Sequence, residues 1–175
     1  MIPLFNTHGP DFLIKVRDAH PSDAKEITRV TNAAYVAEHF CLQGDRTDEA
    51  DVHARMASGR FLVIEDPSDP TRLCGSVFLS MADGRGYLGT LSVDPKSQGK
   101  GIAKVLVAAV EERCRQGGCS FLDITVVNLR KELFPFYAKL GFNPSAILPF
   151  PRPAKMLQPL HLIQMTKPLR AIEDL

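Results

Sequence analysis

The chain has 175 residues, of which 45% are hydrophobic and 23% are charged, and its formal net charge at pH 7 is +1. This size and composition are typical of one soluble globular domain, and the balanced charge gives no general attraction to nucleic acid or to an anionic membrane. The four cysteines form no CxxC pair and no Cys/His run at zinc spacing, so neither a redox dithiol nor a metal site is expected. No apolar run is long enough to cross a bilayer, and residues 1–20 lack the apolar core of a secretion signal. We therefore expect a cytoplasmic protein with neither nucleic acid nor membrane as a partner.

The first part of the chain is expected to form one strand and two helices. A strand is predicted from Phe12 over the run FLIKVRDA, and a helix over residues 20–40 opens with the start signal Pro21. Ile27, Val30, Ala34 and Tyr35 recur at helical spacing on one face of this helix. A polar stretch then leads to a short helix near residues 48–57.

Three strand-like runs follow, at residues 60–66, 72–81 and 85–94. The two stretches between them, PSDPT and ADGRG, are rich in turn-forming residues. We therefore expect two antiparallel hairpins.

The second half of the chain alternates helix and strand. A helix is predicted from Gly99 to Arg115, a buried strand over residues 119–127, and a second helix over 128–141. Residues 143–160 carry five of the 13 prolines, which favours a loop or an edge strand, and a final strand is predicted at 161–169. Pro135 lies inside the predicted second helix and should kink it or end its first segment.

The order of these elements, a β-meander followed by β-α-β-α-β, predicts an α+β or mixed α/β fold with one central sheet. No linker, internal repeat or low-complexity tract divides the chain. We expect a single domain over residues 1–175, with its core at about 12–168.

The segment SVDPKSQGKGIAKVL places Lys96, Lys100 and Lys104 at the start of a helix with no acidic residue in its first turn. Cations there oppose the helix dipole and repel one another, and the sequence supplies no acidic residue to offset them. We therefore expect the negative charge to come from a bound ligand. Gly99 and Gly101 let the backbone adopt positive φ and let a ligand approach the first helical amides. The pattern predicts an anion-binding cradle.

Two familiar phosphate motifs fit this segment poorly. A P-loop needs GxxxxGK followed by Ser or Thr, which this chain lacks. A dinucleotide fingerprint needs a third glycine where the chain has Lys104, and it needs the glycines directly after the strand. Asp123 lies about twenty residues past the turn, where a ribose-binding acid would be, but strand alternation also explains it.

A third motif fits. The run QGKGIA, from Gln98 to Ala103, matches the Gln/Arg-x-x-Gly-x-Gly/Ala signature of the GNAT superfamily of N-acetyltransferases, and residues 88–118 resemble that family's strand, pyrophosphate loop and helix. The later run FYAKLGF is similar to the family's Tyr-x-x-x-Gly-Phe element. The resemblance implies a central twisted, mostly antiparallel sheet flanked by helices, with a β-α-β unit that binds acetyl-CoA as cosubstrate and no metal.

The resemblance also implies roles for individual residues. The segment before the helix would hold the pyrophosphate of acetyl-CoA through its amides, and the preceding strand would splay at a bulge and pair with the pantetheine arm. Asn128 resembles the family residue that contacts this arm, and Tyr137 matches the tyrosine that protonates the departing thiolate. The implied cofactor-binding residues are Leu91, Ser92, Val93, Gln98, Gly99, Lys100, Gly101, Ile102, Ala103, Lys104 and Asn128.

The general base and the acceptor stay open at this level. No acid lies between Tyr87 and Val93, so the alternatives for the base are Asp83, Glu38, His39 or a chain of waters. The acceptor, a primary amine of a small molecule or peptide, would enter between the polar loop at 41–48 and the proline-rich segment at 145–159.

Two other functions compete with direct acetyl transfer in a ternary complex. A non-catalytic acyl-CoA sensor would keep the cradle without a base, and a nicotinamide-dependent enzyme would bind a dinucleotide there. A homodimer is an open alternative for the oligomeric state.

Overall fold

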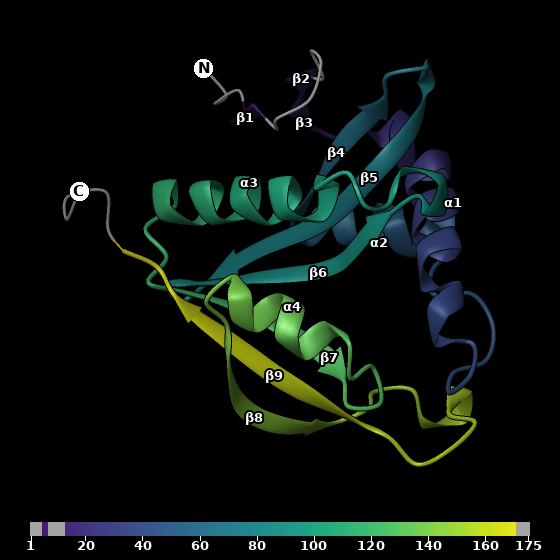
Figure 1. Ribbon diagram of the computed structural model, residues 1–175, viewed down its shortest axis with the longest axis vertical. Helices are drawn as coiled ribbons and strands as arrows, with labels where there is room; N and C mark the ends of the chain where they lie inside the picture. The colour runs from purple at the N-terminus through teal and green to yellow at the C-terminus, as the bar shows by residue number, and fades with distance from the viewer. Residues whose placement is uncertain (1–4, 7–12, 171–175) are drawn as a thin grey trace.

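The centre of the protein is a seven-stranded sheet (Figure 1). The structure, a computed structural model, describes residues 5–6 and 13–170. The strand order is β3-β4-β5-β6-β7-β9-β8, and neighbouring strands are antiparallel except for β6 and β7, which are parallel. The strands are β3 (Val16–Asp18), β4 (Arg60–Asp66), β5 (Asp69–Ala82), β6 (Arg85–Val93), β7 (Phe121–Val127), β8 (Asn143–Pro149) and β9 (His161–Pro168). This arrangement confirms the predicted α+β fold class.

A short second pair of strands, β1 (Phe5–Asn6) and β2 (Leu13–Ile14), precedes the sheet. Phe12, the predicted start of the first strand, lies outside the described residues, as do most of residues 1–12. The strand pattern that follows it continues in β2 and β3.

Helices cover both faces of the sheet (Figure 1). One buried cluster joins α1 (Ala24–Tyr35) and α2 (Glu49–Ser58) to one face, and another joins α3 (Ile102–Gln116) and α4 (Leu133–Lys139) to the opposite face. Short 3₁₀ turns lie at Pro21–Asp23, Val36–Glu38, Pro95–Ser97 and Pro153–Lys155. Across the described ranges, no helix combines the length and the apolar character needed to span a membrane.

Helix α3 begins at Ile102, with Gly101 as its N-cap, so the periodicity that predicted a helix from Gly99 placed its start three residues early, whereas the turn expected at the two glycines is confirmed. Gly99 and Gly101 have φ values of 78° and 80°, a left-handed conformation that ends helical geometry and favours glycine. Both glycines therefore form the turn that precedes the helix. The predicted apolar stripe is confirmed, because Ile102, Val105, Leu106 and Val110 are buried.

Helix α4 spans only Leu133–Lys139, so the predicted helix over residues 128–141 is too long. Pro135 is consequently the third residue of the helix and lies in its first turn. Backbone N–H groups in that turn have no partner within the helix, so proline removes no hydrogen bond. The predicted kink is wrong, and the helix runs through Pro135 without interruption.

The hairpins and the edge strand follow the sequence closely. Strands β4, β5 and β6 form two consecutive antiparallel hairpins, as predicted from their turn residues. The proline-rich segment supplies β8, which lies at the edge of the sheet. Proline has no N–H to donate, and an edge strand tolerates this because only one of its sides is hydrogen-bonded to a neighbouring strand. The final strand, β9, is inserted between β8 and β7.

Strand β6 bulges at Thr90, whose φ of 43° is rare for a β-branched residue. Thr90 and Leu91 together lie opposite the single residue Val77 of β5, which bends the strand. On its other side, β6 pairs with β7 only through residues 85–87 and 121–123. Beyond these pairs the two parallel strands diverge (Figure 1).

Candidate active site

A cavity of about 560 Å³ opens between the diverging strands β6 and β7. Residues 87–91 of β6 line one side and residues 124–127 of β7 line the other. Helix α4 contributes Leu133, Phe136 and Tyr137 to the lining. The volume is that of a small-molecule site, and the gap in the sheet therefore provides space for a ligand.

The turn before α3, which is the predicted anion-binding cradle, adjoins this cavity, because Gln98 and Ala103 belong to the cavity lining. The backbone N–H groups of residues 98–104 have no hydrogen-bond acceptor among the described residues. A Cβ atom added to Gly99 or Gly101 would meet no atom within 4 Å, so the space in front of these amides is open. Unpaired amides at a helix N-terminus attract anions. The cradle fits a phosphate or pyrophosphate group.

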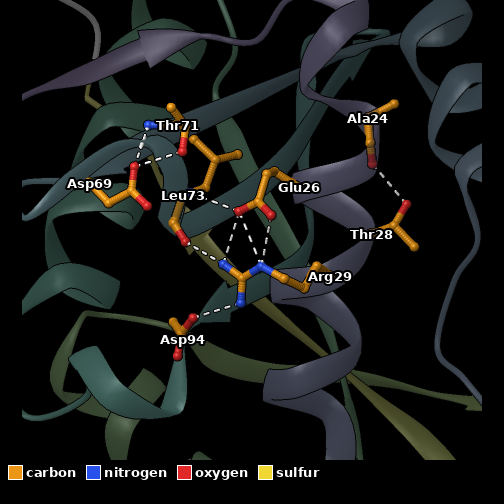
Figure 2. A network of polar contacts seen from close by, with 8 residues as sticks. All are labelled: Ala24, Glu26, Thr28, Arg29, Asp69, Thr71, Leu73 and Asp94. Carbon is orange, nitrogen blue, oxygen red and sulfur yellow. Dashed lines mark hydrogen bonds and ion pairs between the residues drawn. The ribbon is translucent and has the colours of Figure 1, made fainter.

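A polar network fixes the cradle to helix α1 (Figure 2). Arg29 donates from one guanidinium nitrogen to the Asp94 carboxylate at 2.8 Å and from another to the main-chain carbonyl of Leu73 at 2.9 Å. Glu26 pairs with Arg29 and also accepts the Leu73 N–H at 3.0 Å. Asp94 in turn accepts the N–H of Lys96 at 3.0 Å and so shapes the turn that leads to the cradle. Burial by itself would raise the pKa of Asp94, but hydrogen bonds from Arg29 and from the Lys96 N–H outweigh it and lower the pKa of Asp94.

Tyr137 lies in a buried aromatic cluster. Its ring makes edge contacts with Phe136 and Phe142, at centroid distances of 5.0 and 5.7 Å. Its hydroxyl has no hydrogen-bond partner among the described residues, and the side chain lines the cavity. Burial raises the pKa of Tyr137 well above its ordinary value, so the phenol stays protonated at neutral pH. It is therefore available as a proton donor.

Glu38 is the base candidate that the geometry favours. Its carboxylate is buried, lines the cavity, and accepts a hydrogen bond from Arg130 at 3.3 Å. Burial raises the pKa of Glu38, while Arg46 and Arg130 oppose that effect. His39 also lines the cavity, but it is exposed, and Asp83 belongs to the exposed β5–β6 turn outside the cavity.

The cavity lining includes five of the residues predicted from sequence: Leu91, Val93, Gln98, Ala103 and Tyr137. Gly99, Lys100, Gly101 and Lys104 lie on the adjoining cradle. Ser92 points elsewhere, because it is 1% exposed and its Oγ donates to the carbonyl of Thr90 at 2.8 Å. Ile102 is buried in the core beneath α3.

Asn128 is not among the residues that line the cavity. Its Oδ1 accepts the N–H of His161 at 2.9 Å, and its own N–H donates to the carbonyl of His161 at 3.0 Å. These two bonds hold the end of β7 against the start of β9. In the structure Asn128 therefore joins two neighbouring strands and does not line the cavity.

Sequence reasoning missed several polar residues of the cavity, among them Thr90, Tyr35 and Arg130. Thr90 is 7% exposed, and its hydroxyl has no partner among the described residues. The family resemblance implied a bulge in this strand, but the run LGTLSV does not itself indicate that Thr90 is the residue turned toward the cavity. Tyr35 matched the apolar stripe of its helix, and this explains why its hydroxyl was overlooked; burial raises its pKa to about 12.

Two segments far apart in the sequence form the outer wall of the cavity. Gln43 donates its N–H to the carbonyl of Lys155 at 2.9 Å, and Leu42 forms an isolated bridge with Met156. Lys155 Nζ donates to the carbonyl of Asp45 at 2.8 Å. The polar loop and the proline-rich segment, predicted to flank the acceptor entrance, thus meet as one wall.

Comparisons with known proteins agree with this architecture. A mycothiol acetyltransferase from Propionibacterium freudenreichii is 31% identical over 147 residues, which make up 79% of this chain and 45% of that protein. A second mycothiol acetyltransferase, from Nocardia farcinica, is matched over 48% of its length. The chain therefore spans about half the length of these curated relatives.

Solved structures show the same fold at low sequence identity. The ribosomal-protein-S18-alanine N-acetyltransferase of Escherichia coli superposes with a TM-score of 0.71 at 16% identity, over 93% of this chain and 99% of that one. A phosphinothricin acetyltransferase from Sinorhizobium meliloti, solved in complex with acetyl-CoA, gives 0.70 at 18% identity, over 89% and 88%. Residues 25–142 match the model of the acetyltransferase (GNAT) family. The chain, with its splayed sheet, amide cradle and buried tyrosine, belongs to the GNAT acetyltransferase family.

Proposed function

We propose that this protein transfers an acetyl group from acetyl-CoA to a primary amine by direct attack in a ternary complex. The observation that carries the proposal is that a single cavity is lined by Gln98 and Ala103, which adjoin the cradle, and also by Tyr137 and Glu38. One cavity thus offers an anion site, an acid and a base. A related fold, the phosphinothricin acetyltransferase noted above, binds acetyl-CoA.

The cradle suits the pyrophosphate of acetyl-CoA. The N–H groups of residues 98–104 would donate to its oxygens, and the exposed Lys96, Lys100 and Lys104 would add positive charge. Acetyl-CoA, when bound, supplies a thioester whose carbonyl carbon is the electrophile. The bound anion would also remove the electrostatic penalty of three cations near the start of α3.

Strand β6 is suited to hold the arm that carries the thioester. Beyond residue 87, β6 has no pairing with β7, so the backbone groups of Leu91 and Val93 on that side are available to a ligand. They would pair with the amides of the pantetheine arm as a neighbouring strand would. A backbone N–H at the bulge would donate to the thioester oxygen as negative charge develops there.

Proton transfer would be shared between two residues. An amine of pKa about 10.4 is mostly protonated at neutral pH, and removing its proton costs roughly 4 to 5 kcal/mol. Glu38 would accept this proton, directly or through a water, as the new C–N bond forms. Tyr137 would donate its proton to the sulfur as the C–S bond breaks.

Direct transfer is preferred to an acyl-cysteine intermediate. All four cysteines are buried, and burial raises the pKa of Cys74 to about 11 and of Cys114 to about 12. Burial also raises the pKa of Cys41, whose chain neighbour Leu42 lines the cavity. A thiol that remains protonated is a poor nucleophile.

A two-part assay tests the proposal. Calorimetry should detect binding of acetyl-CoA, and a thiol reagent should detect CoA released only when an amine from a broad panel is added. Binding of acetyl-CoA without amine-dependent release would instead support the sensor function. Thermal stabilisation by NADH and none by CoA would overturn both.

A further inference from the structure

The acceptor end of the cavity is rich in cationic side chains. Among the described residues, two carboxylates line the cavity, Glu38 and Asp45. Five cations line it: Arg46, Arg55, Arg130, Arg152 and Lys155. The excess of positive charge is local, because the whole chain has a formal net charge of only +1.

Three of these cations already have polar partners. Arg55 pairs with Asp51 at 3.0 Å, and Arg130 pairs with Glu38 at 3.3 Å. Lys155 donates to a main-chain carbonyl in the opposite segment of the wall. Arg152 is exposed at the rim.

Arg46 differs from them because its guanidinium has no ion pair or hydrogen bond with any described residue, although it is half-buried and lines the cavity. It lies over the ring of Tyr35, with 5.2 Å between its Cζ and the ring centroid. Stacking on an aromatic ring holds the guanidinium plane and leaves its edge donors free. Such an edge matches the two oxygens of a carboxylate.

The backbone that carries Arg46 is also fixed. Asn32 Oδ1 accepts the N–H groups of Arg46 and Thr47, each at 3.0 Å, and Asn32 Nδ2 donates to the carbonyl of Thr47 at 3.0 Å. These three bonds attach the loop to α1 before any ligand binds. The position of Arg46 is therefore built into the fold and does not depend on a mobile surface chain.

Arg46 stacks on Tyr35, Glu38 follows Tyr35 by three residues in the same helical segment, and both charged side chains line the cavity. An acceptor whose amine faces Glu38 and whose acid group faces Arg46 would need only a few bonds between the two groups. We infer that the acceptor is an amino acid or a close derivative with a free carboxylate, which Arg46 binds while Arg152 adds positive charge at the rim. This inference rests on the proposed function, whose acceptor it specifies.

Matched acceptors provide the test. Ten L-amino acids are each compared with their carboxamides, both by CoA release and by calorimetric binding to the CoA-loaded protein. An amino acid carboxamide is the less basic amine and is more readily deprotonated, so a preference for the acid must come from recognition. In at least one pair we expect kcat/KM and affinity to be about 10-fold or more higher for the acid.

Variants assign that preference to Arg46. Arg46→Gln should bring the acid-to-amide ratio close to one, and Arg46→Lys, which keeps the charge but loses the planar fork, should give an intermediate ratio. Arg60→Gln is the matched control, because Arg60 is an exposed arginine on β4 outside the cavity lining. It should leave the ratio unchanged.

The outcomes separate this inference from the proposed function. If only amines without a carboxylate are acetylated, the inference is overturned and the acetyltransferase proposal stands. The same holds if the preference for the acid survives Arg46→Gln in protein with a wild-type melting temperature. If acids bind in an Arg46-dependent manner without CoA release, the carboxylate site is supported and the proposed catalysis fails. If acids neither bind nor react, the inference is overturned.

Discussion

Arg29 and Asp94, which are 65 residues apart in sequence, join helix α1 to the turn that leads to the cradle through a 2.8 Å ion pair. Both side chains are mostly shielded, with exposures of 29% and 14%. The pair thus transmits the position of α1, which carries the acceptor side of the cavity, to the site proposed for the pyrophosphate.

Arg29→Gln should therefore weaken acetyl-CoA binding. Removing the guanidinium leaves the Asp94 carboxylate without its partner, which costs about 1–3 kcal/mol. Part of this cost lowers the free energy of unfolding, and part of it distorts the turn that leads to the cradle. We expect KM for acetyl-CoA to rise by roughly 5- to 30-fold, measured by initial rates. Arg113→Gln is the control, since Arg113 pairs with Asp18 at 2.9 Å near the opposite end of α3 from the cradle. An equal rise in KM for both variants would contradict this role.

Gly101→Ala should impair cofactor binding more than it impairs folding. The φ of 80° makes alanine strained by about 1–2 kcal/mol, and the added methyl group would project into the open space before the cradle amides. Gly84→Ala is the matched control, because Gly84 has a φ of 72°, open surroundings and a place in the β5–β6 turn. Both should lower Tm similarly, and only Gly101→Ala should lower the calorimetric affinity for CoA.

Tyr137→Phe should reduce kcat while leaving acetyl-CoA affinity close to that of the wild type. The ring contacts with Phe136 and Phe142 remain, and only the proton donor is removed. A loss of roughly 100-fold or more in kcat is expected for a general acid. Tyr87→Phe removes another hydroxyl from the cavity lining and should have a much smaller effect. Unchanged turnover across the pH range would remove Tyr137 from the mechanism.

Glu38→Gln should lower activity near neutral pH by about 100-fold. The deficit should shrink as pH rises, because the amine then loses its proton to solvent without help. Initial rates between neutral and alkaline pH measure this change. A deficit that stays constant with pH would show that Glu38 has some other role.

The same substitution makes a prediction about stability. Burial raises the pKa of Glu38 above 4.5, so this group stabilises the native state most below that pH and loses the contribution as pH rises through the folded-state value. At neutral pH, Glu38→Gln should therefore melt no lower than the wild type. The pKa of Glu132 is shifted in the opposite direction, because its hydrogen bond with Arg130 lowers it. Ionised Glu132 therefore stabilises the native state at neutral pH, and Glu132→Gln should cost a little stability there and nothing in strong acid. Thermal melts between about pH 2 and 8 check both signs.

Much of the fold and the cradle could be predicted from local patterns in the sequence. Turn residues predicted both hairpins, prolines predicted the edge strand β8, and Gly99 and Gly101 predicted the left-handed turn before α3. Each of these signals lies within about fifteen neighbouring residues, where backbone preference and helix electrostatics act directly.

The rest depended on contacts between distant segments. Glu38 and Arg130 are 92 residues apart, and nothing near either residue in the sequence indicates their pairing. The inward position of Thr90 depends on a register shift against β5, which a strand pattern of alternating side chains does not reveal. The kink expected at Pro135 was wrong because the true start of α4 placed the proline in a first turn.

The brief pairing between β6 and β7 has a mechanical consequence. Three residues on each strand pair at this point, so beyond them no backbone ladder joins β6 to the part of the sheet formed by β7, β9 and β8. A ligand arm that pairs with β6 would supply backbone hydrogen bonds in the place of the missing ladder. Amide hydrogen exchange in residues 88–93 and 124–127 should then slow together when CoA binds, because the ligand would act as an eighth strand that couples the unfolding of both parts.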